Sequence, residues 1–167
     1  AVVGALGDLQ DRNKGRSLRR LNQTFVKDAE ENGLLEVTTD LLLFGRETRP
    51  VYKALASTMN PFIPGLSGEE DKCLGFLVNL SVPLKSGERW RSVADLSFEE
   101  KQKIFSQLSA YLSSRGFPES LILQLVGNAY TLLREEAGTP FRDAREYASL
   151  LNACAKMGRT GLGVSLC

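Results

Sequence analysis

The sequence predicts a mainly α-helical fold with a few short strands, and three observations support this expectation. Apolar residues recur at spacings of three and four in several segments, which is typical of helices with one buried face. Two segments open with Ser-x-x-Glu, the capping-box pattern that marks a helix start. Alternating, β-branched stretches are short and few. With 167 residues, the chain can form one domain with its own core, or one domain with pieces of its neighbours.

The N-terminal part of the chain is expected to contain the end of a strand, a helix and a short strand. Residues 1–10 are apolar and spaced by glycine, like a strand end that runs into a helix. The next helix ends at Gly33, which stands where a C-cap glycine belongs. Its apolar side is formed by Leu18, Leu21, Phe25 and Ala29. Residues 34–39, LLEVTT, alternate and carry β-branched side chains, so they predict a short strand.

The middle of the chain is expected to hold a charged turn, a helix, a loop and a second helix. The turn is GRETRP, and its last residue, Pro50, can open the following helix at the first helical position. Residues 60–68 contain two prolines and two glycines and should form a loop. Ser67 and Glu70 then form a capping-box pattern that predicts a helix over 69–80.

Two further helices are expected before the C-terminal segment. Ser97 and Glu100 form the second capping box, and the helix that they open ends near Gly116. One side of this helix carries Ile104, Phe105, Leu108, Tyr111 and Leu112. The next helix begins at Pro118 and runs to Glu136. Its apolar side is formed by Leu121, Leu125, Ala129 and Leu132.

The composition excludes several kinds of chemistry. The chain has no histidine, which removes histidine acid–base catalysis, Ser-His-Asp and Cys-His nucleophiles, and histidine metal ligands. Its three cysteines form no CxxC motif, so we expect buried, reduced thiols in a cytoplasmic protein. No apolar run approaches the ~20 residues of a membrane span. The net charge of +1 indicates no general attraction to nucleic acid or membrane. Because the chain begins without methionine, we expect a piece of a longer polypeptide.

The last predicted helix, residues 142–158, carries a polar stripe on one side. At about 100° per residue, the members of this stripe fall within an arc of about 60°. They are Arg145, Ser149, Asn152 and Lys156. Two cations and two neutral hydrogen-bonding groups, without a carboxylate, suit the anionic acceptors of a phosphodiester backbone. A solvated helix face is the alternative interpretation.

Two charged segments are further candidates for binding. In the most basic stretch, RNKGRSLRR, Arg16, Arg19 and Arg20 are candidates for steering single-stranded nucleic acid. This stretch has no aromatic residue, so it offers no base stacking, and a mobile basic loop is the alternative. In GRETRP, Arg46 and Arg49 either belong to a salt-bridged structural turn or contact a phosphate group or a partner.

Three parts of the chain carry distinctive motifs: VVGALGDLQDR at residues 2–12, FGRETRPVYKAL with NPFIPGLSGEE at 44–55 and 60–70, and RDAREYASLLNACAKMGR at 142–159. Together they resemble, in the family's order, the archaeal RecJ-like single-stranded-DNA-specific exonucleases of the GINS-associated type, members of the DHH phosphoesterase superfamily. VVGALGDLQDR, residues 2–12, resembles the last metal-binding motif of their DHH domain. FGRETRPVYKAL and NPFIPGLSGEE, residues 44–55 and 60–70, resemble the segment that joins this domain to the next. RDAREYASLLNACAKMGR, residues 142–159, resembles the opening helix of the DHH-associated domain.

The resemblance implies a division of the chain into three parts. Residues 1–20 would be the C-terminal end of the DHH domain. Residues 21–140 would form a helix-rich intervening domain that binds a partner, and residues 141–167 would start the DHH-associated, substrate-binding domain. The expected fold is therefore a mainly α, helical inserted domain with a few short strands, flanked by incomplete pieces of α/β domains.

The resemblance also implies metal-dependent chemistry for the longer protein. Asp8 matches the family's aspartate that binds one of two divalent metals, Mn²⁺ or Mg²⁺. Its hard carboxylate oxygen suits such a cation, and Gly4 and Gly7 allow close backbone approach. On the residues alone, the preferred interpretation of Asp8 is a helix-start or surface carboxylate. The Asp-His-His motif that supplies other ligands is absent, so we expect neither metal binding nor hydrolysis by this chain.

Two functions remain open on the sequence. The first is a non-catalytic middle part of a Mn²⁺-dependent RecJ-like 5′–3′ exonuclease, bearing a helical module that binds the replication complex GINS. The second is a catalytic or substrate-binding piece that itself binds single-stranded DNA or RNA, with Arg145, Asn152 and Lys156 on the phosphates. The lack of most metal ligands favours the first. The expected partners are single-stranded nucleic acid and a GINS-type protein, and no membrane.

Overall fold

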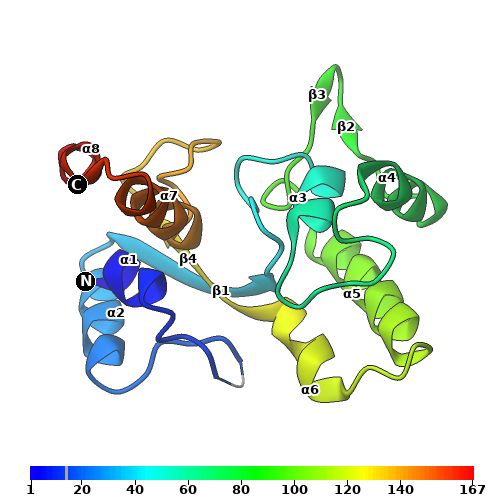
Figure 1. Ribbon diagram of the computed structural model, residues 1–167, viewed down its shortest axis with the longest axis horizontal. Helices are drawn as coiled ribbons and strands as arrows, with labels where there is room; N and C mark the ends of the chain where they lie inside the picture. Colours follow the sequence, from blue (N-terminus) through cyan, green and yellow to red (C-terminus); the bar gives the residue numbers. More distant parts are fainter. Residues whose placement is uncertain (14) are drawn as a thin grey trace.

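The computed structural model of the protein describes residues 1–13 and 15–167 and contains two lobes joined by a two-stranded antiparallel ribbon (Figure 1). The ribbon pairs β1 (Leu35–Leu41) with β4 (Val126–Leu132). Its register runs from Leu35 opposite Leu132 to Leu41 opposite Val126. One end of the ribbon packs in the core of the first lobe and the other end packs in the core of the second.

The first lobe brings both ends of the chain together. It is built from α1 (Val2–Gly7), α2 (Leu21–Glu31), α7 (Ala144–Lys156) and α8 (Thr160–Ser165). Its core gathers Val2, Leu6, Val26, Leu35, Tyr130 and Ala148. The buried Tyr130 hydroxyl accepts a hydrogen bond from the backbone N–H of Leu18 at 2.8 Å, which ties the end of the basic stretch to the ribbon.

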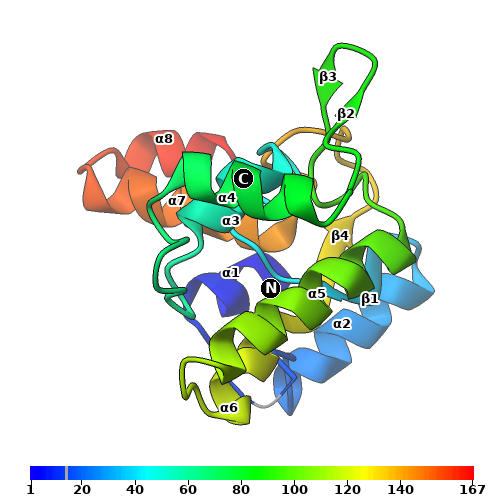
Figure 2. The same ribbon diagram turned by 90° about the vertical axis from the view of Figure 1, so that its right-hand side faces the viewer.

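The second lobe is formed entirely by the middle of the chain. It contains α3 (Val51–Ser57), α4 (Glu70–Asn79), α5 (Phe98–Ser113), α6 (Glu119–Ile122) and the 3₁₀ turn η1 (Leu123–Leu125). Its core includes the fully buried Leu55, Ile63, Leu77, Ile104, Leu108 and Leu125. A small hairpin of β2 (Lys85–Ser86) and β3 (Arg89–Trp90) projects from this lobe (Figure 2).

The prediction of a mainly helical fold with a few short strands is confirmed. α2 is followed by Gly33 at φ +63°, the left-handed conformation that glycine supplies at a helix end. Both hydrogen bonds of the capping box of α5 are present. The backbone N–H of Glu100 donates to the Ser97 hydroxyl at 3.3 Å, and the Glu100 carboxylate accepts from the Ser97 N–H at 2.7 Å.

The helix predicted from Pro118 to Glu136 is wrong beyond its first turns. α6 and η1 end at Leu125, and residues 126–132 form strand β4 instead. β1 requires a partner strand for its backbone N–H and C=O groups, and β4 provides it. A side chain at Gly127 would lie 2.5 Å from Cβ of Arg16 and 2.7 Å from the Gly15 carbonyl oxygen, so the strand passes close to the basic stretch.

Other local predictions are corrected in smaller ways. Residues 1–10 contain α1 rather than a strand end, and Pro50 precedes α3 as its N-cap. Ser67 does not cap α4, because its hydroxyl is used inside the preceding loop. It donates to the Thr58 carbonyl at 2.6 Å and accepts from the Ile63 N–H at 2.9 Å. The short helix α8 has no counterpart in the sequence prediction.

The thiols differ in environment. Cys73 and Cys154 are buried and Cys167 is exposed. Burial raises the pKa of the Cys73 thiol to about 12, so this group stays protonated at neutral pH. Every helix in the described part of the chain is too short or too polar to cross a lipid bilayer.

Candidate nucleic-acid-binding site

α7 is positioned by its N-cap, and its polar stripe faces the end of α1. The Asp143 carboxylate accepts hydrogen bonds from the backbone N–H groups of Arg145 and Glu146 at 2.9 and 3.1 Å, which fixes the helix start. Further along α7, the Asn152 side-chain amide donates to the carbonyl oxygen of Gly7 at 3.0 Å. The stripe is therefore only partly solvated, and two of its members contact the N-terminal segment.

Arg145 is held by Asp11, a carboxylate that the sequence analysis did not single out. Asp11 is 2 % exposed and accepts from Arg145 Nη2 at 2.7 Å and from Arg16 Nε at 3.3 Å. The Arg145 guanidinium also donates to the carbonyls of Asn128 and Arg16, at 2.6 and 3.0 Å, and lies over the Tyr130 ring. Because these contacts occupy both terminal nitrogens of its guanidinium, Arg145 mainly fixes the loop after α1 against α7.

Asp8 lies exposed at the C-terminal end of α1, three residues before Asp11. Its carboxylate accepts one hydrogen bond, from the Gln10 amide at 2.8 Å. A free carboxylate oxygen fits a hard divalent cation. The described residues nevertheless contain no group of three or more His, Cys, Asp or Glu that could hold a metal ion. Asp8 therefore fits as one ligand, and it would require ligands from elsewhere.

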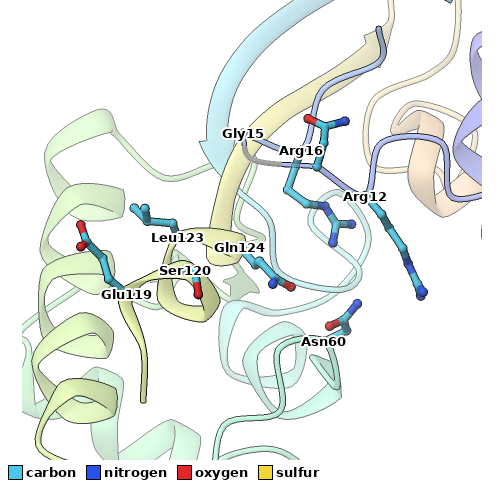
Figure 3. A pocket seen from close by; sticks show the side chains of 9 residues that line it. Arg12, Gly15, Arg16, Asn60, Glu119, Ser120, Leu123 and Gln124 are labelled. Atoms are coloured by element: carbon cyan, nitrogen blue, oxygen red, sulfur yellow. The ribbon is translucent and has the colours of Figure 1, made fainter. Parts of the chain in front are cut away.

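Two neighbouring cavities lie between the lobes and share Arg16, Asn60 and Gln124. The one beside α7 has a volume of about 470 Å³. Its wall combines residues of three segments. They are Gly7 and Leu9 on either side of Asp8, Phe44 just before the charged turn and Arg46 within it, and Ser149 and Asn152 of the polar stripe. The second cavity, of about 570 Å³, adds Arg12 and residues of α6, as Figure 3 shows. The fold thus brings three separately predicted segments to one place.

Arg46 is buried and lies in a cluster of acidic residues. Its Nε is 3.1 Å from a carboxylate oxygen of Asp40, and its Nη1 is 3.6 Å from those of Glu47 and Asp143. Neither nitrogen forms a hydrogen bond with a described residue, so the attraction is chiefly electrostatic. In the structure, Arg46 therefore belongs to a buried ion cluster at the cavity wall.

The remaining predicted cations do not all lie at the cavities. Arg49 is exposed and donates to the Ser57 hydroxyl at 2.6 Å, beside the cavities. Arg19 lines a separate groove between α2 and β1, and Arg20 is exposed just before α2. Lys156 is exposed at the end of the polar stripe. The lysine at position 14 of the basic stretch lies outside the described residues.

Glu146 connects α7 to the charged turn and was also not predicted. Its carboxylate accepts from the backbone N–H of Glu47 at 2.6 Å and from the Thr48 hydroxyl at 2.5 Å. Burial raises the pKa of this carboxyl above its ordinary value, against the opposing effect of these hydrogen bonds. A glutamate in the first turn of a helix is a common surface residue, so the sequence offered no signal for this role.

Comparisons with known proteins identify the family of the chain. A family model described as the DHH-CID domain matches residues 43–126, which is about half of the chain. A protein of Methanocaldococcus jannaschii, described as uncharacterized, is 25% identical over 167 residues. That match covers 100% of this chain and 33% of the relative, so the chain spans a third of the length of the curated relative that it matches. The match over residues 43–126 coincides with the second lobe and shows that the chain belongs to the DHH-CID domain family, and through it to the DHH superfamily.

Proposed function

We propose that this chain is the middle part of a RecJ-like, metal-dependent exonuclease acting on single-stranded nucleic acid, and that the chain alone does not hydrolyse it. The observation that supports this proposal best is the meeting of three segments at one cavity. These are the turn around Asp8, the charged turn with the preceding Phe44, and the polar stripe of α7. A single strand that reaches the cavity would contact all three segments.

Asp8 suits one position in the metal centre of such an enzyme. When bound, a Mn²⁺ or Mg²⁺ ion would activate a water molecule and neutralise charge on the phosphodiester. Asp8 would hold the ion through its Oδ1 atom, because the hydrogen bond from Gln10 is made to Oδ2. The other ligands would come from other parts of the longer protein.

Phosphate contacts would come from cations that the fold leaves available. Arg12 lines the second cavity and Lys156 ends the polar stripe, and both side chains are exposed. Neither forms an ion pair with any residue that the structure describes. Asn152 keeps one amide N–H for a phosphate oxygen after its bond to Gly7. These groups would position the strand without reading its sequence.

The salt dependence of binding tests this proposal. A fluorescein-labelled single-stranded oligothymidylate is titrated with the full-length polypeptide in EDTA at several KCl concentrations. We expect the affinity to fall with salt, and Arg12→Ala to reduce the slope of log affinity against log salt by about 0.7. Arg89→Ala, at an exposed arginine of the projecting hairpin, is the matched control and should leave the slope unchanged. A salt-independent affinity, or equal effects of both substitutions, contradicts the proposal.

A second proposal concerns the helical module of residues 43–126, which we propose binds a GINS-type replication protein. The projecting hairpin of β2 and β3 supports it (Figure 1). Its Trp90 is 36% exposed and contacts Lys85, whose Nζ is 4.8 Å from the indole centroid, and Tyr52, whose ring centroid is 5.1 Å away. A fixed, partly exposed tryptophan is a typical anchor of a protein interface.

Direct binding of purified GINS to the full-length polypeptide tests this second proposal. We expect Trp90→Ala to weaken binding by about 30-fold, the effect of a central anchor residue. Phe98→Ala, on α5 and outside the hairpin, is the control because Phe98 is 72% exposed. An unchanged affinity of the Trp90 variant excludes the hairpin as the interface.

A further inference from the structure

We infer that Phe44, supported by Arg49, stacks against a nucleobase of the single-stranded ligand, and this inference rests on the proposed function. The basic stretch near Asp8 has no aromatic side chain with which to hold a base. The fold provides one from the end of β1, because Phe44 lines the same cavity as Gly7, Leu9 and Asn152. Phe44 is 46% exposed, so its side chain is accessible to a ligand in this cavity.

The Phe44 side chain is held in a defined position from two sides. Its backbone N–H donates to the Thr58 hydroxyl at 2.9 Å, which fixes the chain at this point. The Arg49 guanidinium carbon lies 5.1 Å from the ring centroid, within the range of a cation–π contact. Arg49 is itself fixed by its hydrogen bond to Ser57 at 2.6 Å. An aromatic ring that is already positioned loses little conformational freedom when a base stacks on it.

Gly45 is required for this arrangement. It adopts φ +81°, which a side chain disfavours, and a Cβ atom there would lie 2.4 Å from Cδ and 2.5 Å from Cγ of Arg49. Only glycine therefore lets the Arg49 side chain fold back across the turn onto the Phe44 ring. Within the GRETRP turn, Gly45 therefore leaves the space that the Arg49 side chain needs to reach the Phe44 ring.

The surroundings of Phe44 favour a nucleic acid strand over a cationic or purely apolar ligand. Met59, 58% exposed, and Asn60 line the same cavity, so apolar and hydrogen-bonding groups lie next to the ring. The carboxylates on the wall already have partners: Asp11 has two arginines, and Glu146 accepts from the charged turn. Exposed cations at Arg12 and Arg49 complement a phosphate backbone.

Affinity for single-stranded oligonucleotides tests the inference. The full-length polypeptide in EDTA is titrated with fluorescein-labelled oligothymidylate, and with copies that carry one abasic residue at each position in turn. We expect Phe44→Leu to weaken binding by about tenfold and Phe44→Trp to retain it, because stacking requires a π-face. Phe25→Leu is the matched control, since Phe25 is 44% exposed on α2, away from the cavity.

The abasic series shows whether a base contacts Phe44. One abasic position should weaken binding to the wild type by about tenfold and have no further effect on the Phe44→Leu variant. Three results would overturn the inference. The Phe44→Leu variant could bind the oligonucleotide with unchanged affinity, its loss of affinity could add to that of the abasic residue at every position, or it could lose only the binding of a protein partner. If hydrolysis still depends on Asp8 in that case, base stacking fails while the proposed function stands. If no oligonucleotide binds at all, both fail.

Discussion

Replacement of Asp8 by Asn in the full-length polypeptide is expected to lower Mn²⁺-dependent hydrolysis of a single-stranded oligonucleotide by about a thousandfold. The reason is that a neutral amide is a poor ligand for a hard divalent cation, and a metal ion contributes several kcal/mol to stabilising the transition state of phosphodiester hydrolysis. Binding of the oligonucleotide in EDTA should remain within about twofold, because Asp8 donates no hydrogen bond to phosphate. The measurement is the initial rate of nucleotide release at saturating substrate.

The position of Asp8 allows its effect on activity to be separated from its effect on stability. A carboxylate at the C-terminal end of α1 faces the negative end of the helix dipole, which is unfavourable by a few tenths of a kcal/mol. Asp8→Asn should therefore leave the unfolding free energy unchanged or slightly raise it. Asp28→Asn, at an exposed aspartate of α2, is the control and should retain full activity. Retention of activity in the Asp8 variant would remove Asp8 from the metal centre.

The fold was predictable wherever a local signal had no competitor. The capping box at Ser97 and Glu100 specifies the start of α5, and Gly33 specifies the end of α2, because each acts within one turn of helix. Residues 125–132 are compatible with two structures. Leu125, Ala129 and Leu132 fit the spacing of a helix, whereas in a strand Gly127, Ala129 and Thr131 lie on one face, where they are buried. Pairing with β1 decides between them, and that pairing joins residues far apart in the sequence.

The candidate site was predictable only as separate segments. The helical periodicity predicted that Arg145 and Asn152 share one side of α7, and both contact the N-terminal segment from that side. Neither Asp11, the partner of Arg145, nor Phe44 beside the cavity had a sequence signal. Their roles depend on contacts between residues distant in the chain, which only the fold establishes. Arg46 and Arg49, two charges in one turn, take different roles because one is buried and the other exposed.

The two lobes are connected by more than the ribbon itself. The Arg46 cluster contains Asp40 of β1 and Asp143, the N-cap of α7, and Arg46 Nη2 donates to the Thr131 hydroxyl of β4 at 3.5 Å. From the second lobe, Lys101 of α5 donates to Asp40 at 2.9 Å. The cluster therefore links β1, β4, α5 and α7 at the point where the cavities open. We expect it to set the relative position of the α7 stripe and the 43–126 module.

Replacement of Arg46 by Met is expected to lower the free energy of unfolding by about 3–5 kcal/mol. Methionine keeps much of the side-chain volume but leaves the carboxylates of Asp40, Glu47 and Asp143, each less than a tenth exposed, without their shared cation. Lys101 compensates only Asp40. The measurement is urea denaturation followed by circular dichroism, compared at constant m-value. Arg46→Lys should recover part of the loss, because it restores the charge without the guanidinium geometry.

Arg89→Met provides the matched control for Arg46→Met. Arg89 also forms an ion pair, with Asp95 at 2.9 Å, but its side chain is largely exposed, so its removal should lower the unfolding free energy far less than the removal of Arg46 does. A loss of this small size at Arg46 would show that the buried cluster contributes little to stability. Equal losses for Arg46→Met and Arg46→Lys would instead show that geometry outweighs charge. The expected order, with Arg46→Met lowest and Arg89→Met nearest to wild type, follows because an unpaired charge is far less favourable in the interior than at the surface.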